Sequence, residues 1–293
     1  MGAVVSIARY LRAHRQGSNW RCACPLDCGY MLSLAEGEGG KLLAYCHGGC
    51  DFAAILAALV GYGLLDDDDG ANLPHESPVR KSDIADRKFR IEGACRIYSQ
   101  SADAPQIETY LRSRAIALSS PVLRFCQSAP HRLGTRRPAM VAPIVDINGQ
   151  QTGAHLTYLR SDGTGKADLP KEFQRECRGV IGGGVIRLAT HDPECELLVG
   201  EGVETALSAM EIFKRPGWAA VYAGNLKEDL MLPPEVRRVV ITADNDESGT
   251  GQKNALAAKQ RWLSQGRAVR IVIPPRIGTD FNDFLMERIN GAG

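Results

Sequence analysis

Short apolar runs alternate with segments of helical periodicity in the last third of the chain. The runs are residues 196–200, 218–224, 238–244 and 268–274. In the segment after the first run, Ala206, Met210 and Phe213 fall on one helical face. Near-continuous apolar strands joined by helices are typical of a parallel sheet that is covered on both faces. We therefore expect a Rossmann-like α/β domain over residues 191–293.

The pattern changes in the middle of the chain, over residues 84–190. This region opens with helical periodicity through Ile91, Cys95 and Tyr98, and then becomes strand-like and rich in glycine. The dipeptide Asn148-Gly149 lies between two strand-like runs and is typical of a hairpin turn. The sequence predicts an α+β subdomain here.

Residues 66–83 have no hydrophobic periodicity and begin with four consecutive aspartates. Like charges, glycine and proline in such a run indicate a linker. The linker separates the first 65 residues, which are rich in cysteine, from the rest of the chain. The overall fold class is thus α/β, with a small N-terminal module in front of it.

Composition places the chain among folded globular proteins. It has 293 residues, of which 44% are hydrophobic and 24% charged, and a formal net charge of +1. Any affinity for nucleic acid must therefore be local. The apolar stretches are shorter than the ~20 residues of a membrane span, and the N-terminus lacks the features of a secretion signal. We expect a cytoplasmic protein with no membrane partner.

Five of the nine cysteines lie between Cys22 and Cys50. Two groups of soft ligands with strand-like residues between them can form a tetrahedral thiolate site, because a hairpin brings the two groups together. We expect a structural Zn²⁺ in a zinc ribbon. The expected ligands are Cys24, Cys28, Cys46 and Cys50, with Cys22 and His47 as alternative donors. Buried thiols that bind no metal are the simpler alternative.

Acidic residues follow three of the four C-terminal apolar runs. Glu201 follows the first run, Asp244 and Asp246 the third, and Asp280 and Asp283 the fourth. Sites in parallel α/β sheets lie at the carboxyl ends of the strands, so we expect these side chains to converge. Carboxylates without Cys or His favour Mg²⁺ or Mn²⁺. One isolated D-x-D would more simply be a solvated turn.

These motifs resemble a known family. GEGVETALS, ADNDESG and DFNDFL are similar to the acidic motifs of the Toprim domain. The order of a zinc ribbon similar to the CHC2 type, then PIVDINGQQTGAHLTYLRSDGTGKA, then Toprim resembles bacterial-type primases. The most similar group consists of short primase-like proteins of phages, plasmids and integrated elements. The zinc ribbon would then bind DNA.

The resemblance implies a DNA primase, a nucleotidyltransferase that makes short primers on single-stranded DNA from nucleoside triphosphates in DNA replication. Glu201, Asp244 and Asp246 would be catalytic and would bind Mg²⁺ or Mn²⁺ with Asp280 and Asp283 for in-line phosphoryl transfer. Glu201 could instead be a general base. The residues expected to contact DNA or nucleotide are Arg160, Lys166, Arg136 and Arg137. A helicase or another replication protein would be a further partner.

The sequence departs from the family in three places. Asp27 stands where the zinc motif usually has a histidine, and Thr205 stands where many primases have a further acidic residue, with Glu204 beside it. The chain also ends just after the Toprim motifs, without the helical regions with which primases contact a helicase.

Two other functions remain open: a Toprim-type metal-dependent nuclease and a non-catalytic DNA-binding module of a mobile element. Close carboxylates repel one another without a cation, and this argues against the non-catalytic module. For the same reason, removing Asp246 is expected to leave the metal-free protein equally stable or more stable.

Overall fold

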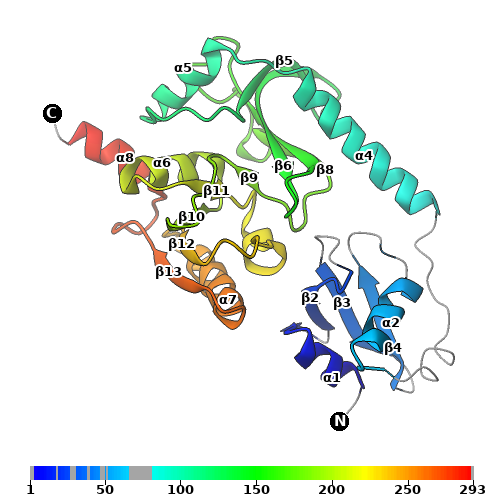
Figure 1. Ribbon diagram of the computed structural model, residues 1–293. Helices are drawn as coiled ribbons and strands as arrows, with labels where there is room; N and C mark the ends of the chain where they lie inside the picture. The colour runs from blue at the N-terminus through cyan, green and yellow to red at the C-terminus, as the bar shows by residue number, and fades with distance from the viewer. Residues whose placement is uncertain are drawn as a thin grey trace. The chain divides into compact units, whose positions relative to one another are not determined.

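The computed structural model describes residues 3–17, 19–26, 31–37, 40–46, 50, 52–65 and 81–291. The chain divides into two compact units, residues 1–88 and 89–293. Figure 1 shows the elements of both units in chain order.

The first unit is built on a small antiparallel sheet in the order β1-β2-β3-β4. Its elements are α1 (Ala3–Tyr10), β1 (His14–Gln16), β2 (Asn19–Ala23), β3 (Met31–Glu36), β4 (Leu42–Cys46) and α2 (Phe52–Gly61). The hairpin of β3 and β4 is the one expected between the two groups of cysteines. Leu32 and Leu34 of this hairpin are fully buried, as is Ile7 of α1, and Ile55 of α2 is nearly so.

Most of the predicted linker lies outside the described residues, which resume at Lys81. A helix begins there, α4 (Lys81–Ser99), so the last three residues of the expected linker are helical. The boundary between the compact units lies within α4, after Lys88.

The middle of the chain is α+β. After α4 come α5 (Pro105–Ser113), β5 (Arg124–Pro130), β6 (Arg136–Val145), β7 (Gln151–Tyr158), the 3-10 turn η2 (Lys171–Phe173) and β8 (Arg175–Gly179). The four strands form an antiparallel sheet in chain order. The turn between β6 and β7 contains Gly149 with a φ of 80°, a conformation that glycine adopts without strain.

The C-terminal region contains the expected parallel sheet. Its elements are β9 (Ile186–Arg187), β10 (Leu197–Gly200), α6 (Val203–Phe213), β11 (Gly217–Ala219), η3 (Asn225–Asp229), β12 (Arg238–Thr242), α7 (Thr250–Ser264), β13 (Ala268–Val272) and α8 (Phe281–Asn290). The strand order is β13-β12-β10-β11-β9. All pairs are parallel except β11 with β9, which is antiparallel.

One expected βα unit differs from the prediction. The second apolar run forms only the three-residue strand β11, and the segment after it is a five-residue π-helix, η3, instead of an α-helix. Asn225 at its start is fully buried and donates its side-chain amide to the carbonyls of Gly184 and Ala220. The segment therefore provides hydrogen-bond donors for backbone carbonyls next to β9 and β11, and it does not form a long helix that covers the sheet.

Both faces of the parallel sheet are buried. Alternate strand residues point to opposite faces, so Leu198 and Val240 lie in one hydrophobic cluster while Val199 and Ile241 lie in the other. Figure 1 shows α6 and α8 on one face and α7 on the other. The cluster under α6 also contains Tyr110 and other side chains of the middle region, and this shared core joins the two regions into one unit.

No helix among the described residues is long and apolar enough to cross a membrane.

Candidate active site

Three carboxylates meet at the edge of the parallel sheet where its strands end. Glu201 follows β10 and Asp244 follows β12, and these strands are paired in register, Gly200 opposite Thr242. Asp280 precedes α8, just after the loop that follows β13. These side chains lie at one edge because neighbouring parallel strands end at the same edge of a sheet.

Asp244 is the most strongly perturbed of these acids. Burial, then the negative charges of Glu201, Asp280 and Asp246, raises the pKa of Asp244 to about 7. Its Oδ1 atom is buried, and no group in the described part of the chain forms a hydrogen bond with it. Burial also raises the pKa of Glu201 and that of Asp280. A buried acceptor among like charges is the environment that a cation would stabilise.

Asp246 is differently placed from Asp244. Its carboxylate accepts the backbone N–H groups of Thr250 and Gly251 at the start of α7, at 3.0 and 2.6 Å, and the Ser248 hydroxyl. These hydrogen bonds, led by that of Ser248, lower the pKa of Asp246 to about 2. Asp246 therefore stabilises the helix N-terminus while its charge still acts on Asp244.

Asp280 and Asp283 form a reciprocal cap at the start of α8. The Asp280 carboxylate accepts the N–H of Asp283 at 2.8 Å, and the Asp283 carboxylate accepts the N–H of Asp280 at 3.1 Å. This capping box needs only residues three apart in sequence. The charge of Asp280 also acts on Asp244 and Arg175, so Asp280 belongs to the site as well as to the cap.

The carboxylates are set more widely than the ligands of a closed cage. Among the described residues, one group of three possible ligand atoms of His, Cys, Asp or Glu has all its members within 4.8 Å of one another, and it consists of cysteine sulfurs. The oxygens of the three carboxylates do not all lie this close together. Mg²⁺ usually keeps several water molecules and is held by one or two protein carboxylates. The open set of Glu201, Asp244 and Asp280 fits a hydrated divalent cation of this kind.

A cationic group lies beside the acids. Lys166 Nζ is 3.1 Å and Arg175 Nη2 3.5 Å from Glu204 Oε1, and the Tyr110 hydroxyl donates to the same oxygen at 2.6 Å. Glu204 chiefly raises the pKa of Arg175, and Glu201 and Asp280 add to this effect. Lys166 was expected from the sequence, whereas Arg175, Tyr110 and Glu204 were not assigned a role. The sequence signal for Glu204 was its position three residues after Glu201, between the apolar residues Val203 and Ala206 of the helical segment.

A pocket of about 420 Å³ adjoins this group. Three arginines, Arg132, Arg175 and Arg178, line it, and Glu176 is the acidic residue among its lining residues. Buried His155 also lines it; burial lowers the pKa of His155 to about 4, so this imidazole adds no positive charge at neutral pH.

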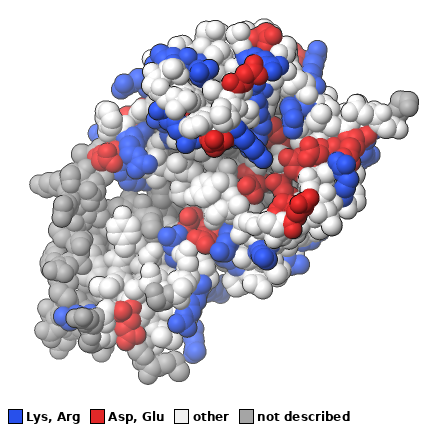
Figure 2. Space-filling model, turned by 180° about the vertical axis from the view of Figure 1, so that it is seen from behind, with Lys and Arg blue, Asp and Glu red and all other residues white. Residues whose placement is uncertain are grey.

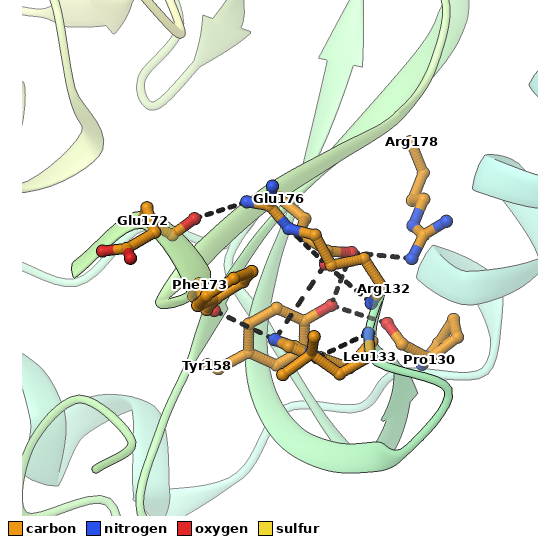
Figure 3. A network of polar contacts seen from close by, with 9 residues as sticks. Pro130, Arg132, Leu133, Tyr158, Glu172, Phe173, Glu176 and Arg178 are labelled. Carbon is orange, nitrogen blue, oxygen red and sulfur yellow. Dashed lines mark hydrogen bonds and ion pairs between the residues drawn. The ribbon is translucent and has the colours of Figure 1, made fainter. Parts of the chain in front are cut away.

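Figure 3 shows Glu176 between two of these arginines, Arg132 and Arg178. The carboxylate accepts the backbone N–H of Arg132 at 2.7 Å, Arg178 Nη2 at 2.6 Å and the Tyr158 hydroxyl at 3.0 Å. Burial would raise the pKa of Glu176, but these partners together hold it below its usual value. The pocket therefore has an excess of positive charge in a fixed arrangement.

The other predicted basic residues lie elsewhere. Arg160 is exposed and pairs with Asp168 at 2.6 Å. Arg136 donates to Ser128 on the neighbouring strand β5, and Arg137 follows it in β6. The two arginines are the first residues of β6. None of these three lines the arginine pocket.

Three of the four expected zinc ligands meet in the first unit. The Sγ atoms of Cys24, Cys46 and Cys50 lie within 4.8 Å of one another, and those of Cys24 and Cys50 are 3.8 Å apart. A tetrahedral site with Zn–S bonds of roughly 2.3 Å has sulfurs about 3.8 Å apart, so the donors fit zinc. Cys28 and His47 lie outside the described residues. Cys22 is buried in β2 and is not part of the cluster.

Charged side chains are unevenly distributed on the surface as well. Figure 2 shows acidic side chains gathered in one area of the face in view, with Lys and Arg side chains near them. The net charge of +1 therefore conceals local patches of both signs.

Comparison with known families decides the nature of the C-terminal region. Residues 196–291 match the family model of the Toprim domain. This range includes Glu201, Glu204, Asp244, Asp246, Asp280 and Asp283. This part of the chain is a Toprim domain. The predicted resemblance to the Toprim domain is thereby confirmed. Residues 88–188, directly before the Toprim domain, match a model described as a domain of unknown function, DUF7146. No curated protein matches the chain.

Similar solved structures are primases. The zinc-binding and RNA polymerase domains of the Aquifex aeolicus primase are 18% identical, with 98% of this chain and 80% of that chain covered and a TM-score of 0.39. The primase fragment of the bacteriophage T7 primase-helicase is 17% identical, with 66% and 69% covered and a TM-score of 0.41. The E. coli primase catalytic core is 16% identical, with 69% and 75% covered and a TM-score of 0.44.

Proposed function

We propose that this protein is a primase-like nucleotidyltransferase that makes short primers on single-stranded DNA from nucleoside triphosphates. One observation carries the proposal. The buried Asp244 oxygen lacks a hydrogen-bond partner among the described residues and lies at the strand ends with Glu201, where the charge of Arg175 acts on both acids. This combination of acids for a metal and cations for phosphate is what phosphoryl transfer requires.

Glu201, Asp244 and Asp280 would hold the divalent cation, Mg²⁺ or Mn²⁺, which when bound neutralises phosphate charge and lowers the pKa of a coordinated hydroxyl. Asp246 would support this site through its charge and through the start of α7, and Asp283 through the cap that orients Asp280. The acids would thus divide into those that face the metal and those that fix the backbone.

Lys166 and Arg175 would bind the triphosphate, because the two cations share the single carboxylate of Glu204 and so keep a net positive charge. The pocket of Arg132 and Arg178 would hold phosphates of the template strand, with Arg160, Arg136 and Arg137 as more distant contacts. Backbone phosphates bind guanidinium groups without regard to sequence. The zinc module of Cys24, Cys28, Cys46 and Cys50 would add a second DNA-binding surface.

The same proposal places the protein in the cytoplasm, in the replication of DNA that belongs to a mobile element. Its partners would be template DNA, nucleoside triphosphates and a helicase or another replication protein.

A primer-synthesis assay tests the proposal. Wild type, Asp244→Asn and Glu201→Gln would be incubated with single-stranded DNA, labelled nucleotides and Mg²⁺ or Mn²⁺. Arg270→Gln is a matched control, because it breaks an exposed ion pair with Glu196, which precedes β10. We expect short, template-dependent products from wild type and control only.

Two results would contradict primer synthesis. Cutting of the template by wild type but not by the two acid variants would favour the metal-dependent nuclease. Tight binding of DNA with neither products nor cutting would favour the non-catalytic module.

A further inference from the structure

Glu204 lies at the junction between the Toprim domain and the region before it. It sits in the first turn of α6, three residues after Glu201. Its partners come from the other side of the junction: Tyr110 is in α5, Lys166 in the loop after β7, and Arg175 at the start of β8. The residues are up to 94 positions apart in sequence, so only the packing of the two regions brings them together.

One oxygen of Glu204 receives all three partners. Tyr110 Oη, Lys166 Nζ and Arg175 Nη2 lie 2.6, 3.1 and 3.5 Å from Oε1. The side chain of Glu204 is only 4% exposed. Burial by itself would raise the pKa of this carboxyl, but Arg175, Lys166 and the Tyr110 hydroxyl outweigh burial and hold it well below its usual range. Glu204 is therefore an ionised carboxylate at neutral pH.

This arrangement differs from that of the neighbouring acids. Burial raises the pKa of Asp244, Glu201 and Asp280, which lack enough positive partners. Glu204 instead has two cations of its own, one of which, Arg175, also acts on Glu201 and Asp280. Its oxygen Oε1 is already crowded by three donors, so it is poorly placed to serve as a metal ligand.

The charge of Glu204 also determines where the two cations can go. Without it, Lys166 would lose its ion pair, and Arg175 would be attracted by the remaining carboxylates, on which its charge already acts. There Arg175 would compete with a divalent cation for the same oxygens.

We propose that Glu204 is a positioning residue, which holds Lys166 and Arg175 on its own carboxylate and keeps Glu201 and Asp244 accessible to a divalent cation. This role rests on the proposed function of Glu201, Asp244 and Asp280 as a metal site. Glu204 would act on that site through the two cations and would not itself bind the metal. Thr205 stands where many primases have a further acidic residue, and this proposal gives a role to Glu204, the acid beside it.

The test is Glu204→Gln, which keeps the shape of the side chain and removes its charge. The first readout is Mn²⁺ affinity, measured by electron paramagnetic resonance on the full chain without substrate. We expect about tenfold weaker binding, the lower end of the usual effect of removing a supporting residue of a metal site, with unchanged stoichiometry. The second readout is the KM for nucleoside triphosphate, which should rise more than kcat falls.

Two matched variants separate this role from general stability. Glu211→Gln, on the same helix, loses an exposed carboxylate that accepts the N–H groups of Ala117 and Leu118 from the same neighbouring region. It should leave Mn²⁺ affinity unchanged. Tyr110→Phe removes a hydrogen bond to Glu204 but no charge, and should affect Mn²⁺ affinity less than Glu204→Gln does.

A double variant, Glu204→Gln with Arg175→Gln, tests whether Glu204 acts through the cation. If it does, Glu204→Gln weakens Mn²⁺ binding much less in the Arg175→Gln background than in wild type. Wild type is compared with Glu204→Gln, and Arg175→Gln with the double variant, each at a temperature where both proteins are folded. The comparison therefore remains valid if Glu204→Gln lowers the melting temperature.

Three results would overturn the positioning role. Loss of one equivalent of Mn²⁺ would make Glu204 a metal ligand. A lower melting temperature with unchanged Mn²⁺ affinity and KM would make it purely structural, and equal effects in both backgrounds would remove the link to Arg175. Because Mn²⁺ binding is measured without catalysis, failure of primer synthesis alone would leave this test intact.

Discussion

Glu201 lies at the end of β10 beside Asp244 at the end of β12, and the charge of Glu201, added to the larger effect of burial, raises the pKa of Asp244 to about 7. The pair is unfavourable when both groups are ionised and no cation is present. This relationship has a measurable consequence for stability.

We expect Asp244→Asn to be more stable than wild type at pH 8 in buffer without divalent cations. A carboxyl whose pKa rises on folding holds its proton more tightly in the folded state, so wild type loses stability as pH increases from 3.8 to about 7. The variant does not have this loss. The gain should be about 1–2 kcal/mol, roughly 2–8 °C in melting temperature.

Thermal unfolding at pH 5 and pH 8 measures this, and the advantage of the variant should shrink at pH 5. Added Mn²⁺ should raise the melting temperature of wild type more than that of Asp244→Asn. An equal effect of Mn²⁺ on both proteins would contradict the metal site.

Asp246→Asn should have the opposite effect at neutral pH. Asp246 accepts two backbone N–H groups at the start of α7, and its pKa falls on folding, so it stabilises the protein above pH 3.8 and loses this effect as pH falls toward about 2. The expected loss is roughly 0.5–2 kcal/mol, the range for a helix cap. This prediction is the opposite of the expectation from the sequence that removing Asp246 leaves the metal-free protein equally stable or more stable. Urea unfolding at pH 7 measures the difference, and unchanged stability would contradict the cap.

Removing one of the clustered cysteines should abolish zinc binding, whereas removing Cys22 should not. Cys24, Cys46 and Cys50 lie together, but Cys22 contacts the Leu32 carbonyl, and burial, with a smaller effect of Cys46, raises the pKa of Cys22 to about 12. Zinc content per chain, measured by atomic absorption for Cys46→Ala and Cys22→Ala, checks this. Loss of zinc in Cys22→Ala would make Cys22 a ligand.

Arg178→Gln should weaken binding of single-stranded DNA and make it less sensitive to salt. If Arg178 contacts one phosphate, the slope of log affinity against log salt concentration should fall in magnitude by about 0.7. Fluorescence anisotropy with a labelled oligonucleotide over a range of salt concentrations measures this slope. Arg270→Gln is the control, since Arg270 does not line the arginine pocket. Equal slopes for wild type and Arg178→Gln would show that Arg178 does not contact a DNA phosphate.

Features that depend on near neighbours in the sequence were predictable. The strands that end before Glu201 and Asp244 follow from apolar runs, and the hairpin at Gly149 follows from an Asn-Gly pair. The second βα unit was not predictable, because the π-helix at Asn225 is held by hydrogen bonds to Gly184 and Ala220, outside its own segment.

The sequence by itself determined the strand ends, and therefore which acids lie at one edge of the sheet, because strand period and parallel topology are set by local pattern. Only the tertiary structure decided how those acids differ. Asp246 and Asp244 are two residues apart, yet one meets the N-terminus of α7 and the other is buried among like charges. Likewise, Glu204 meets Lys166 and Arg175 only because the shared core packs α6 against the region before it. Charge and burial act through space, and the distances that govern them exist only in the folded chain.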